Sequence, residues 1–224
     1  MPPFVERFSR RQRTEHWIIA LLFFILVLTG LPQKYPETGW AGWIVWALGG
    51  LDIMRWLHRM AGLLFSTFTL YFVGYVVIDT LRGRTALTMV PLPADLKEVY
   101  QSLLWYAGLE ARPRSPRFDY REKFEFWGML FGGLIMVATG MMLYFPLLTA
   151  RWLPGQFIPA AKTVHSYEAL LALMVIVLWH LYNTIFRPSV FPLDRTMIDG
   201  KMLIARLKEE YTRAYLRLVP EDGE

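Results

Sequence analysis

Four stretches of this chain contain no Asp, Glu, Lys or Arg: 17–33, 60–78, 126–150 and 169–186. A helix needs about 20 mainly apolar residues to cross the hydrocarbon of a bilayer, and flanking charged side chains can lengthen the span by snorkelling. Four such stretches among 224 residues, 54% of them hydrophobic, are improbable in a soluble helical domain. The pattern predicts an all-α integral membrane protein with a bundle of four transmembrane helices. We expect them at about 15–31, 52–80, 121–145 and 161–186.

Positive charge alternates between the segments that connect these helices. Segments 1–16, 80–123 and 187–224 hold 4, 8 and 7 Lys and Arg residues, whereas 31–59 and 147–162 hold 3 and 2. Because loops rich in Lys and Arg stay on the cytoplasmic side, both termini are expected in the cytoplasm. The net charge of +5 follows from this topology and gives no support to nucleic-acid binding.

The helices define a membrane domain over 1–188, followed by a cytoplasmic tail over 189–224. An amphipathic helix is expected in the tail, at about 200–218, and another along the membrane surface at 94–106. A Trp-rich apolar segment, 40–51, is a candidate for interfacial anchoring or for docking a partner.

The sequence contains no cysteine, which excludes disulfides, thiolate-bound iron–sulfur clusters and covalently attached c-type haem. It contains four histidines, His16, His58, His165 and His180, each near the end of an apolar stretch. His165 and His180 are 15 positions apart on one expected helix, which is about 22 Å along the axis and close to four turns. The two imidazoles are therefore expected on the same helix face, one near each membrane surface.

The expected topology places His16 with His180 near the cytoplasmic face and His58 with His165 near the opposite face. Two neutral imidazoles on facing helices suit the axial ligation of a haem iron. A single histidine at a helix end is more often an interfacial residue or a packing hydrogen bond, but four that pair by depth favour ligation. We therefore expect two non-covalent b haems.

Three arginines are candidates for binding the haem propionates: Arg13, Arg55 and Arg59. Arg55 and Arg59 flank His58 on a side where positive charge is scarce, whereas Arg13 is explained equally well as an ordinary flanking cation. Glu168, one turn from His165, is either a partner of that histidine or a proton-carrying group.

A short motif occurs twice. Leu28-Thr29-Gly30 ends the first apolar stretch and Ala138-Thr139-Gly140 lies in the third, each followed by a proline. Chance and shared membrane composition explain the motif about as well as an internal duplication.

Several segments together resemble the cytochrome b (gamma) subunits of membrane-bound formate dehydrogenases, in a wider family that also serves nickel–iron hydrogenases and thiosulfate reductases. The resemblance covers about 5–215. It is carried by Phe8-Ser-Arg-Arg-Gln-Arg-Thr-Glu-His16-Trp17, Trp56-Leu-His58-Arg59-Met-Ala-Gly62, Phe118-Asp119-Tyr120-Arg121-Glu122-Lys123 with Phe126-Trp127, His165-Ser-Tyr-Glu-Ala to Trp179-His180, and Phe191-Pro192.

The resemblance implies the prokaryotic inner membrane, two b haems and electron exchange with a quinone, menaquinone or ubiquinone, beside the cytoplasmic haem. It implies a quinone site formed by His180 with Asp119 and Lys123. In place of the family's Tyr-Asn-x-x-x-Lys pattern this chain has Phe118-Asp119 and then Lys123. Asp119 could accept a quinol proton or cap the third helix, and the two roles are compatible.

The sequence therefore predicts a diheme b-type cytochrome subunit of a membrane-bound respiratory complex. Its expected partners are an iron–sulfur or other redox subunit and a catalytic subunit, since nothing in the chain suggests a substrate active site of its own. Two alternatives stay open: a stand-alone quinone-linked cytochrome of the b561 kind, and a haem-free membrane scaffold or transporter.

Overall fold

The computed structural model describes residues 3–82 and 88–218. Within these ranges, four helices are long and apolar enough to cross a membrane, which confirms the predicted fold class. They are α1 (Arg10–Lys34), α3 (Leu51–Leu81), α5 (Tyr120–Tyr144) and a fourth span from Phe157 to Phe186. The fourth span consists of α7 (Phe157–Met174) and two π-helical segments, η1 (Val175–His180) and η2 (Tyr182–Phe186).

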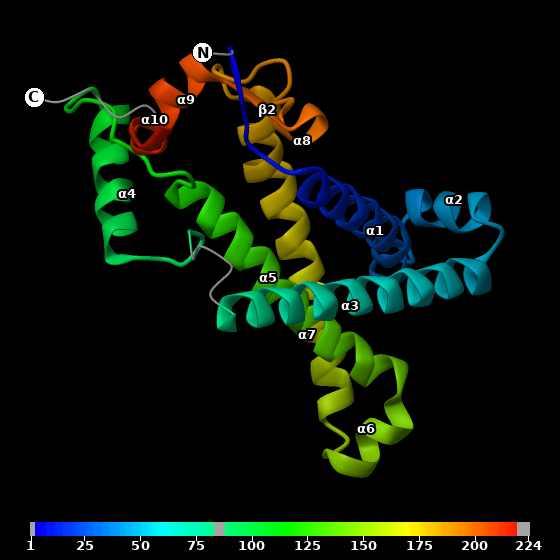
Figure 1. Ribbon diagram of the computed structural model, residues 1–224. Helices are drawn as coiled ribbons and strands as arrows, with labels where there is room; N and C mark the ends of the chain where they lie inside the picture. The colour runs from blue at the N-terminus through cyan, green and yellow to red at the C-terminus, as the bar shows by residue number, and fades with distance from the viewer. Residues whose placement is uncertain (1–2, 83–87, 219–224) are drawn as a thin grey trace, which may run out of the picture.

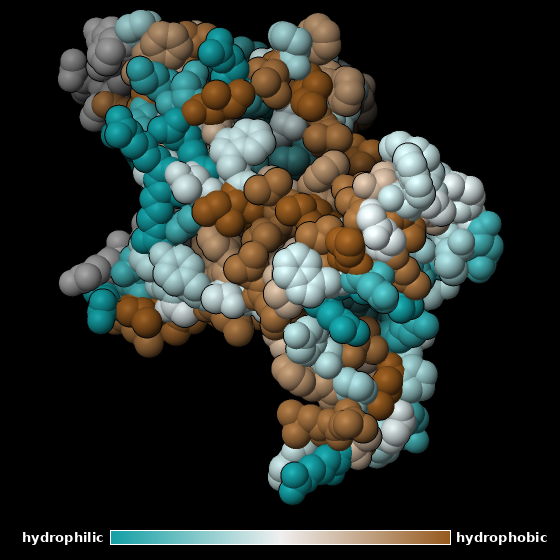
Figure 2. All heavy atoms as spheres, turned by 90° about the vertical axis from the view of Figure 1, so that its right-hand side faces the viewer, coloured by the Kyte–Doolittle hydropathy of each residue, from teal (hydrophilic) through white to brown (hydrophobic). Residues whose placement is uncertain are grey.

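The spans form two hairpins, α1 with α3 and α5 with α7. Figure 1 shows α3 lying across the second hairpin. Few residues in the most apolar part of each span are buried, and in the most apolar part of the fourth span none is. Figure 2 shows hydrophobic side chains gathered across the middle of one face, with hydrophilic ones densest at the upper left and others at the right-hand edge and the lower end. This distribution is expected of helices whose outer surfaces contact lipid.

The first span extends beyond its expected end at about residue 31, since α1 continues to Lys34 with Pro32 inside it. Pro32 is fully buried and lies in the last turn, so the single backbone donor that it lacks is lost near the end of the helix. Gln33 Nε2 donates to Thr29 O at 3.0 Å, and Tyr35 N donates to Leu31 O at 3.0 Å. These bonds satisfy carbonyl groups of the last turn.

Among the described residues, three shorter helices connect the spans. The apolar segment predicted at 40–51 overlaps α2 (Gly39–Ala47), which exposes Trp40, Trp43 and Trp46. The predicted amphipathic surface segment is α4 (Pro93–Tyr106). The connection between α5 and α7 contains α6 (Pro146–Trp152).

The predicted tail helix is wrong over its first residues. Gly200 adopts a left-handed φ of 82° after α8 (Thr196–Asp199). The next residues form β2 (Lys201–Leu203), which pairs antiparallel with β1 (Phe4–Glu6). Only then follow α9 (Ile204–Glu210) and α10 (Thr212–Leu218). The strand forms because the N-terminal segment offers it a partner, a contact that local sequence does not reveal.

The two hairpins are built on an internal repeat. Both α1 and α5 have 25 residues, both begin with a capping box, at Ser9 and at Asp119, and the spacing between equivalent residues is 110. Residues 7–36 align without a gap on 117–146. The positions identical in both are Arg7, Phe8, Arg11, Glu15, Trp17, Ile25, Val27, Thr29, Gly30 and Pro36, matching Arg117, Phe118, Arg121, Glu125, Trp127, Ile135, Val137, Thr139, Gly140 and Pro146. The structure thus favours duplication over chance for the twice-occurring Thr-Gly motif.

Candidate functional site

The loop-side pair, His58 of α3 and His165 of α7, lies near α2 and α6. The two ring centroids are 6.5 Å apart, and the ring planes are inclined by 78°. His58 Nδ1 is 2.9 Å from Thr29 Oγ1, and His165 Nδ1 is 2.9 Å from Thr139 Oγ1. Each half of the repeat therefore contributes one histidine and one threonine in the same arrangement.

The threonines determine which nitrogen of each ring carries the proton. Thr29 Oγ1 donates to Ile25 O at 2.7 Å, and Thr139 Oγ1 donates to Ile135 O at 2.7 Å. With its proton used in this way, each hydroxyl accepts the Nδ1–H of its histidine. Each Nε2 then keeps a free lone pair. A neutral imidazole of this form is the one that binds a metal.

Two glycines let the rings approach the backbone closely. A Cβ atom on Gly30 would lie 3.0 Å from His58 Cε1, and one on Gly140 would lie 3.3 Å from His165 Cε1. Both distances are below an ordinary van der Waals contact. The Thr-Gly motif therefore supplies both the acceptor and the space for each histidine.

The tail-side pair, His16 of α1 and His180 of η1, lies at the other end of the spans, where α1 contacts α8. Its ring centroids are 6.1 Å apart. His180 Nδ1 lies 3.0 Å from Glu125 Oε2 of α5. Within the described residues, His16 Nδ1 is buried without a hydrogen-bond partner. The tail-side histidines thus lack the symmetric threonine support of the loop-side pair.

The repeat places a phenylalanine pair where a second copy of the tail-side pair would be. Adding 110 to His16 leads to Phe126, and Phe72 occupies the position on α3 that corresponds to His180 on the fourth span. The rings of Phe72 and Phe126 have centroids 6.0 Å apart, almost the separation of the histidine pair. His58 and His165 are 107 positions apart, whereas Phe72 and His180 are 108 apart. The fourth span therefore has one extra residue after His165, which the π-helix η1 accommodates.

Both histidine pairs have the separation that one metal ion requires. An imidazole nitrogen lies about 2 Å from a bound metal and about 1.2 Å from its ring centre, so two imidazoles on opposite sides have centroids about 6.4 Å apart. The observed distances are 6.5 and 6.1 Å. Two imidazoles at this separation fit the two axial positions of a metal whose other ligands come from a macrocycle, as in haem.

Comparison with known proteins identifies the family. A sequence model of the family described as prokaryotic cytochrome b561 matches residues 7–200. This chain belongs to that family. It is also similar to two Escherichia coli (strain K12) proteins. One is the formate dehydrogenase cytochrome b556(fdo) subunit, 21% identical over 215 residues that cover 94% of this chain and 92% of the relative. The other is the nitrate-inducible formate dehydrogenase cytochrome b556(Fdn) subunit, 20% identical over 205 residues that cover 91% and 86%.

The three arginines predicted near the haems differ in their surroundings in this membrane b-type cytochrome. Arg55 and Arg59 are exposed, and no described carboxylate lies within ion-pair distance of either. Arg59 lies 5.9 Å from the ring centroid of Tyr144. Arg13 Nη1 instead donates to Ile198 O of α8 at 2.5 Å. Arg13 therefore holds the tail, while Arg55 and Arg59 have no ion-pair partner among the described carboxylates.

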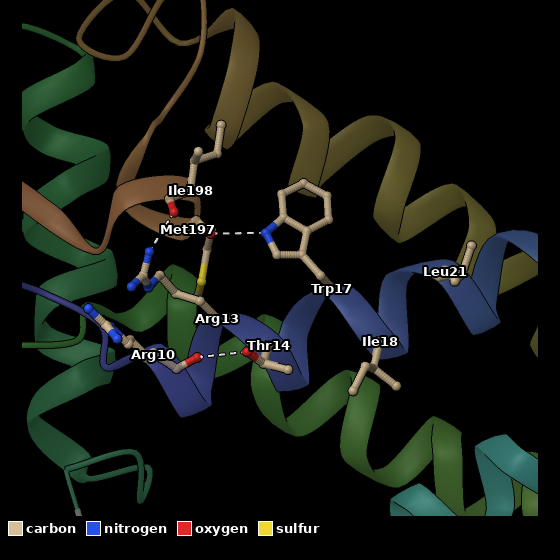
Figure 3. Close-up of a pocket in the computed structure, with 8 residues that line it drawn as sticks. All are labelled: Arg10, Arg13, Thr14, Trp17, Ile18, Leu21, Met197 and Ile198. Atoms are coloured by element: carbon tan, nitrogen blue, oxygen red, sulfur yellow. Dashed lines mark hydrogen bonds between the residues drawn. The ribbon is translucent and has the colours of Figure 1, made fainter.

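A shallow hollow of about 580 Å³ separates α1 from α8 beside Arg13 (Figure 3). Trp17 Nε1 donates across it to Met197 O at 3.0 Å. This bond and that of Arg13 fix the tail against α1, next to His16. Ile18 and Leu21 continue the apolar wall of the hollow along α1.

The residues predicted to form a quinone site all have partners within the protein. Asp119 is 2% exposed, and its carboxylate accepts from Glu122 N and Arg121 Nε. Lys123 is buried and donates to Asp95 of α4 at 2.7 Å. Asp119 is thus the N-cap of α5, one of the two roles left open by the sequence. The structure brings Asp119 and Lys123 to the start of α5, while His180 contacts α5 two residues further along, at Glu125.

A buried carboxyl group lies beside the start of α5. Glu98 of α4 is 7% exposed and accepts a hydrogen bond from Ser115 Oγ. Burial raises the pKa of Glu98 above its ordinary value, an effect that the Ser115 bond opposes and the nearby Asp119 reinforces. This end of the bundle therefore contains polar groups shielded from solvent.

Sequence reasoning missed two features of the site. It recorded the Thr-Gly motif without assigning it a role, and it did not single out Glu125. The signal was present in the alignment of 7–36 with 117–146, in which Thr29, Gly30 and Glu15 recur as Thr139, Gly140 and Glu125.

Proposed function

We propose that this chain binds two b haems, one between His58 and His165 and one between His16 and His180, and carries electrons between them across the membrane. The observation that carries the proposal is the separation of each pair, 6.5 and 6.1 Å between ring centroids. His165 and His180 lie on one continuous span, so a single helix connects the two haems.

When bound, each haem supplies one-electron redox chemistry. The residues of the chain hold and orient it. Thr29 and Thr139 keep the loop-side imidazoles in the tautomer with a free Nε2. Arg55 and Arg59 are the cations we assign to the propionates at that end, because their guanidinium groups have no described carboxylate partner. The hydrocarbon-facing helices exclude water from both pairs.

We place electron exchange with a quinone, menaquinone or ubiquinone, at the tail-side end near His180. Asp119 and Lys123 shape this end of α5 through their ion pairs. Both termini are assigned to the cytoplasm and the chain to the inner membrane, from the distribution of Lys and Arg. The loop-side end then faces the periplasm.

The relatives are named as cytochrome subunits of formate dehydrogenases. By similarity, we propose that this cytochrome works with a redox subunit, such as an iron–sulfur protein, and with a catalytic subunit. The redox subunit would exchange electrons with the loop-side haem. The exposed Trp43 and Trp46 of α2 lie at that end, where they anchor the chain in the interface or contact the partner.

The test is haem content and the reduced-minus-oxidised spectrum of the purified full chain. The wild type should hold two haems per chain with a b-type band. The double variant H16F/H180F copies the pairing of Phe72 with Phe126, so it should fold, retain the loop-side haem and lose the quinol-dependent reduction of that remaining haem. The variant H58A should lose the loop-side haem instead. Two haems in H16F/H180F, or none in the wild type, would refute the proposal.

A further inference from the structure

The repeat shows a rearrangement of charges at the start of α5. In α1, Arg11 Nε donates to Glu15 Oε1 at 2.6 Å, and the two residues of this ion pair are one helical turn apart. The equivalent residues of α5 are Arg121 and Glu125, and the described contacts do not pair them. Arg121 Nε donates instead to Asp119 Oδ2 at 2.8 Å. Glu125 is left to accept the Nδ1–H of His180.

The cause is the capping residue. The N-cap of α1 is Ser9, which is neutral, whereas the N-cap of α5 is Asp119, which carries a charge. Asp119 is almost completely buried, where a guanidinium and a carboxylate attract each other more strongly than at an exposed surface. The cap therefore draws Arg121 away from Glu125.

A carboxylate on a ligating histidine has a defined effect. It accepts the Nδ1 proton, increases the electron density on the ring and makes the ligand more basic. A more basic ligand and a nearby negative charge stabilise ferric over ferrous iron, which lowers the reduction potential. The loop-side histidines donate to neutral threonine hydroxyls, so they lack this influence.

We infer that Glu125 is a positioning residue that lowers the reduction potential of the tail-side haem, and that Asp119 controls it by holding Arg121. This inference rests on the proposed ligation by His180. It assigns Asp119 an electrostatic role at a distance, in addition to its capping role. A tail-side haem of lower potential would be the stronger reductant toward the quinone.

The test is a redox titration of the purified full chain, followed by the haem absorbance. In E125Q one of two haems should titrate at a higher potential. The expected change is about tenfold in its reduced-to-oxidised ratio at fixed ambient potential, which is about 59 mV for a one-electron couple. D119N keeps the helix cap, because Asn is a good N-cap. It should shift the same haem in the same direction, since Arg121 becomes free to pair with Glu125.

The rescue variant separates this route from a general loss of structure. D119N/R121L has no guanidinium to capture Glu125, so it should return toward the wild-type potential. R11Q/E15Q removes the equivalent ion pair of α1 without changing net charge, and it should leave both potentials unchanged.

The outcomes distinguish this inference from the proposed function. Two haems with unshifted potentials in E125Q would overturn the role of Glu125 while leaving the diheme proposal intact. A shift in D119N that persists in D119N/R121L would overturn the role of Asp119. A wild-type chain without a tail-side haem would refute the ligation itself.

Discussion

The two hairpins resemble each other closely at the loop side and differ at the tail side. At the loop side, each contributes a histidine, a threonine and a glycine with nearly equal geometry. At the tail side the repeat produces two aromatic pairs. One is His16 with His180, with ring centroids 6.1 Å apart, and the other is Phe72 with Phe126, with ring centroids 6.0 Å apart. The repeat is therefore retained where both halves serve one site and has diverged where it would produce two.

The difference follows from the geometry of a two-fold repeat. A site formed by equivalent residues of the two halves, such as His58 and His165, occurs only once in a two-fold repeat. A change in either half therefore damages it. A site built from non-equivalent positions, as His16 and His180 are, occurs twice. One copy can then lose its ligands, provided that the replacing side chains fill the same space. Phe72 and Phe126 do so, as an aromatic pair in edge contact.

The largest predicted difference between the halves concerns the arginines that precede their caps. Arg7 is 3% exposed and donates to Glu122 Oε1 at 2.7 Å and to Arg117 O at 2.5 Å. Arg117 is exposed and donates to Arg7 O at 3.1 Å. R7M leaves Glu122 unpaired and should cost about 3 kcal/mol, whereas R117M should cost at most about 1 kcal/mol.

Thermal unfolding in detergent measures this contrast. R7M should lower the midpoint by on the order of 10 °C and R117M by a few degrees at most, on the scale expected for a chain of this size. R7K is the matched control: it keeps the charge near Glu122 and should recover part of the loss. Equal losses in R7M and R117M would mean that the two arginines form a symmetric clasp.

At the loop side the prediction is equality. T29V and T139V each remove a hydroxyl of nearly unchanged shape and leave a histidine Nδ1–H without its acceptor. An unsatisfied buried donor costs about 1–3 kcal/mol, and loss of a hydrogen bond to a metal ligand weakens metal binding about 10- to 100-fold. Both variants should lose loop-side haem to the same extent and retain tail-side haem.

Haem content after dilution, compared with the wild type, checks the threonine prediction. T38V is a control, because the Thr38 hydroxyl donates to Tyr35 O in an exposed hydrogen bond rather than contacting a histidine. A large loss in T29V with none in T139V would show that the two halves are not functionally equivalent at this site.

Much of the architecture is readable from the sequence, because membrane spans depend on composition over about 20 residues rather than on long-range contacts. Each of the four long helices overlaps its expected range, although α1 begins at Arg10 rather than at about residue 15. The place of each histidine toward one end of a span followed from the same argument. The side-by-side placement of His16 with His180 and of His58 with His165 required only the topology.

Features that depend on tertiary contacts were not predictable in the same way. The strand β2 forms because residues 4–6 lie beside it, although the local pattern suggested a helix. The displacement of Arg121 toward Asp119 depends on the burial of the cap. Pro32 is tolerated in α1 because of its place in the last turn. In contrast, the roles of Thr29 and Thr139 could have been proposed from the internal alignment. A polar residue that recurs at the same position of two membrane spans usually has a function.

The smallest predicted effect distinguishes the two halves within the site that they share. An alanine Cβ at position 30 would lie 3.0 Å from His58 Cε1, and at position 140 it would lie 3.3 Å from His165 Cε1. Alanine gains about 1 kcal/mol over glycine within a helix, whereas crowding a packed site costs about 1–3 kcal/mol. G140A should therefore be roughly neutral in thermal unfolding, and G30A should destabilise by about 1 kcal/mol.

G74A is the control, because its added Cβ meets no described atom within 4 Å. It should stabilise the chain, and it measures the gain in helix propensity from glycine to alanine without any crowding. Because both glycines lie against the histidines proposed to bind the loop-side haem, G30A should also perturb the loop-side spectrum more than G140A does. The reverse order would show that the His165 side of the site, not the His58 side, is the more tightly packed.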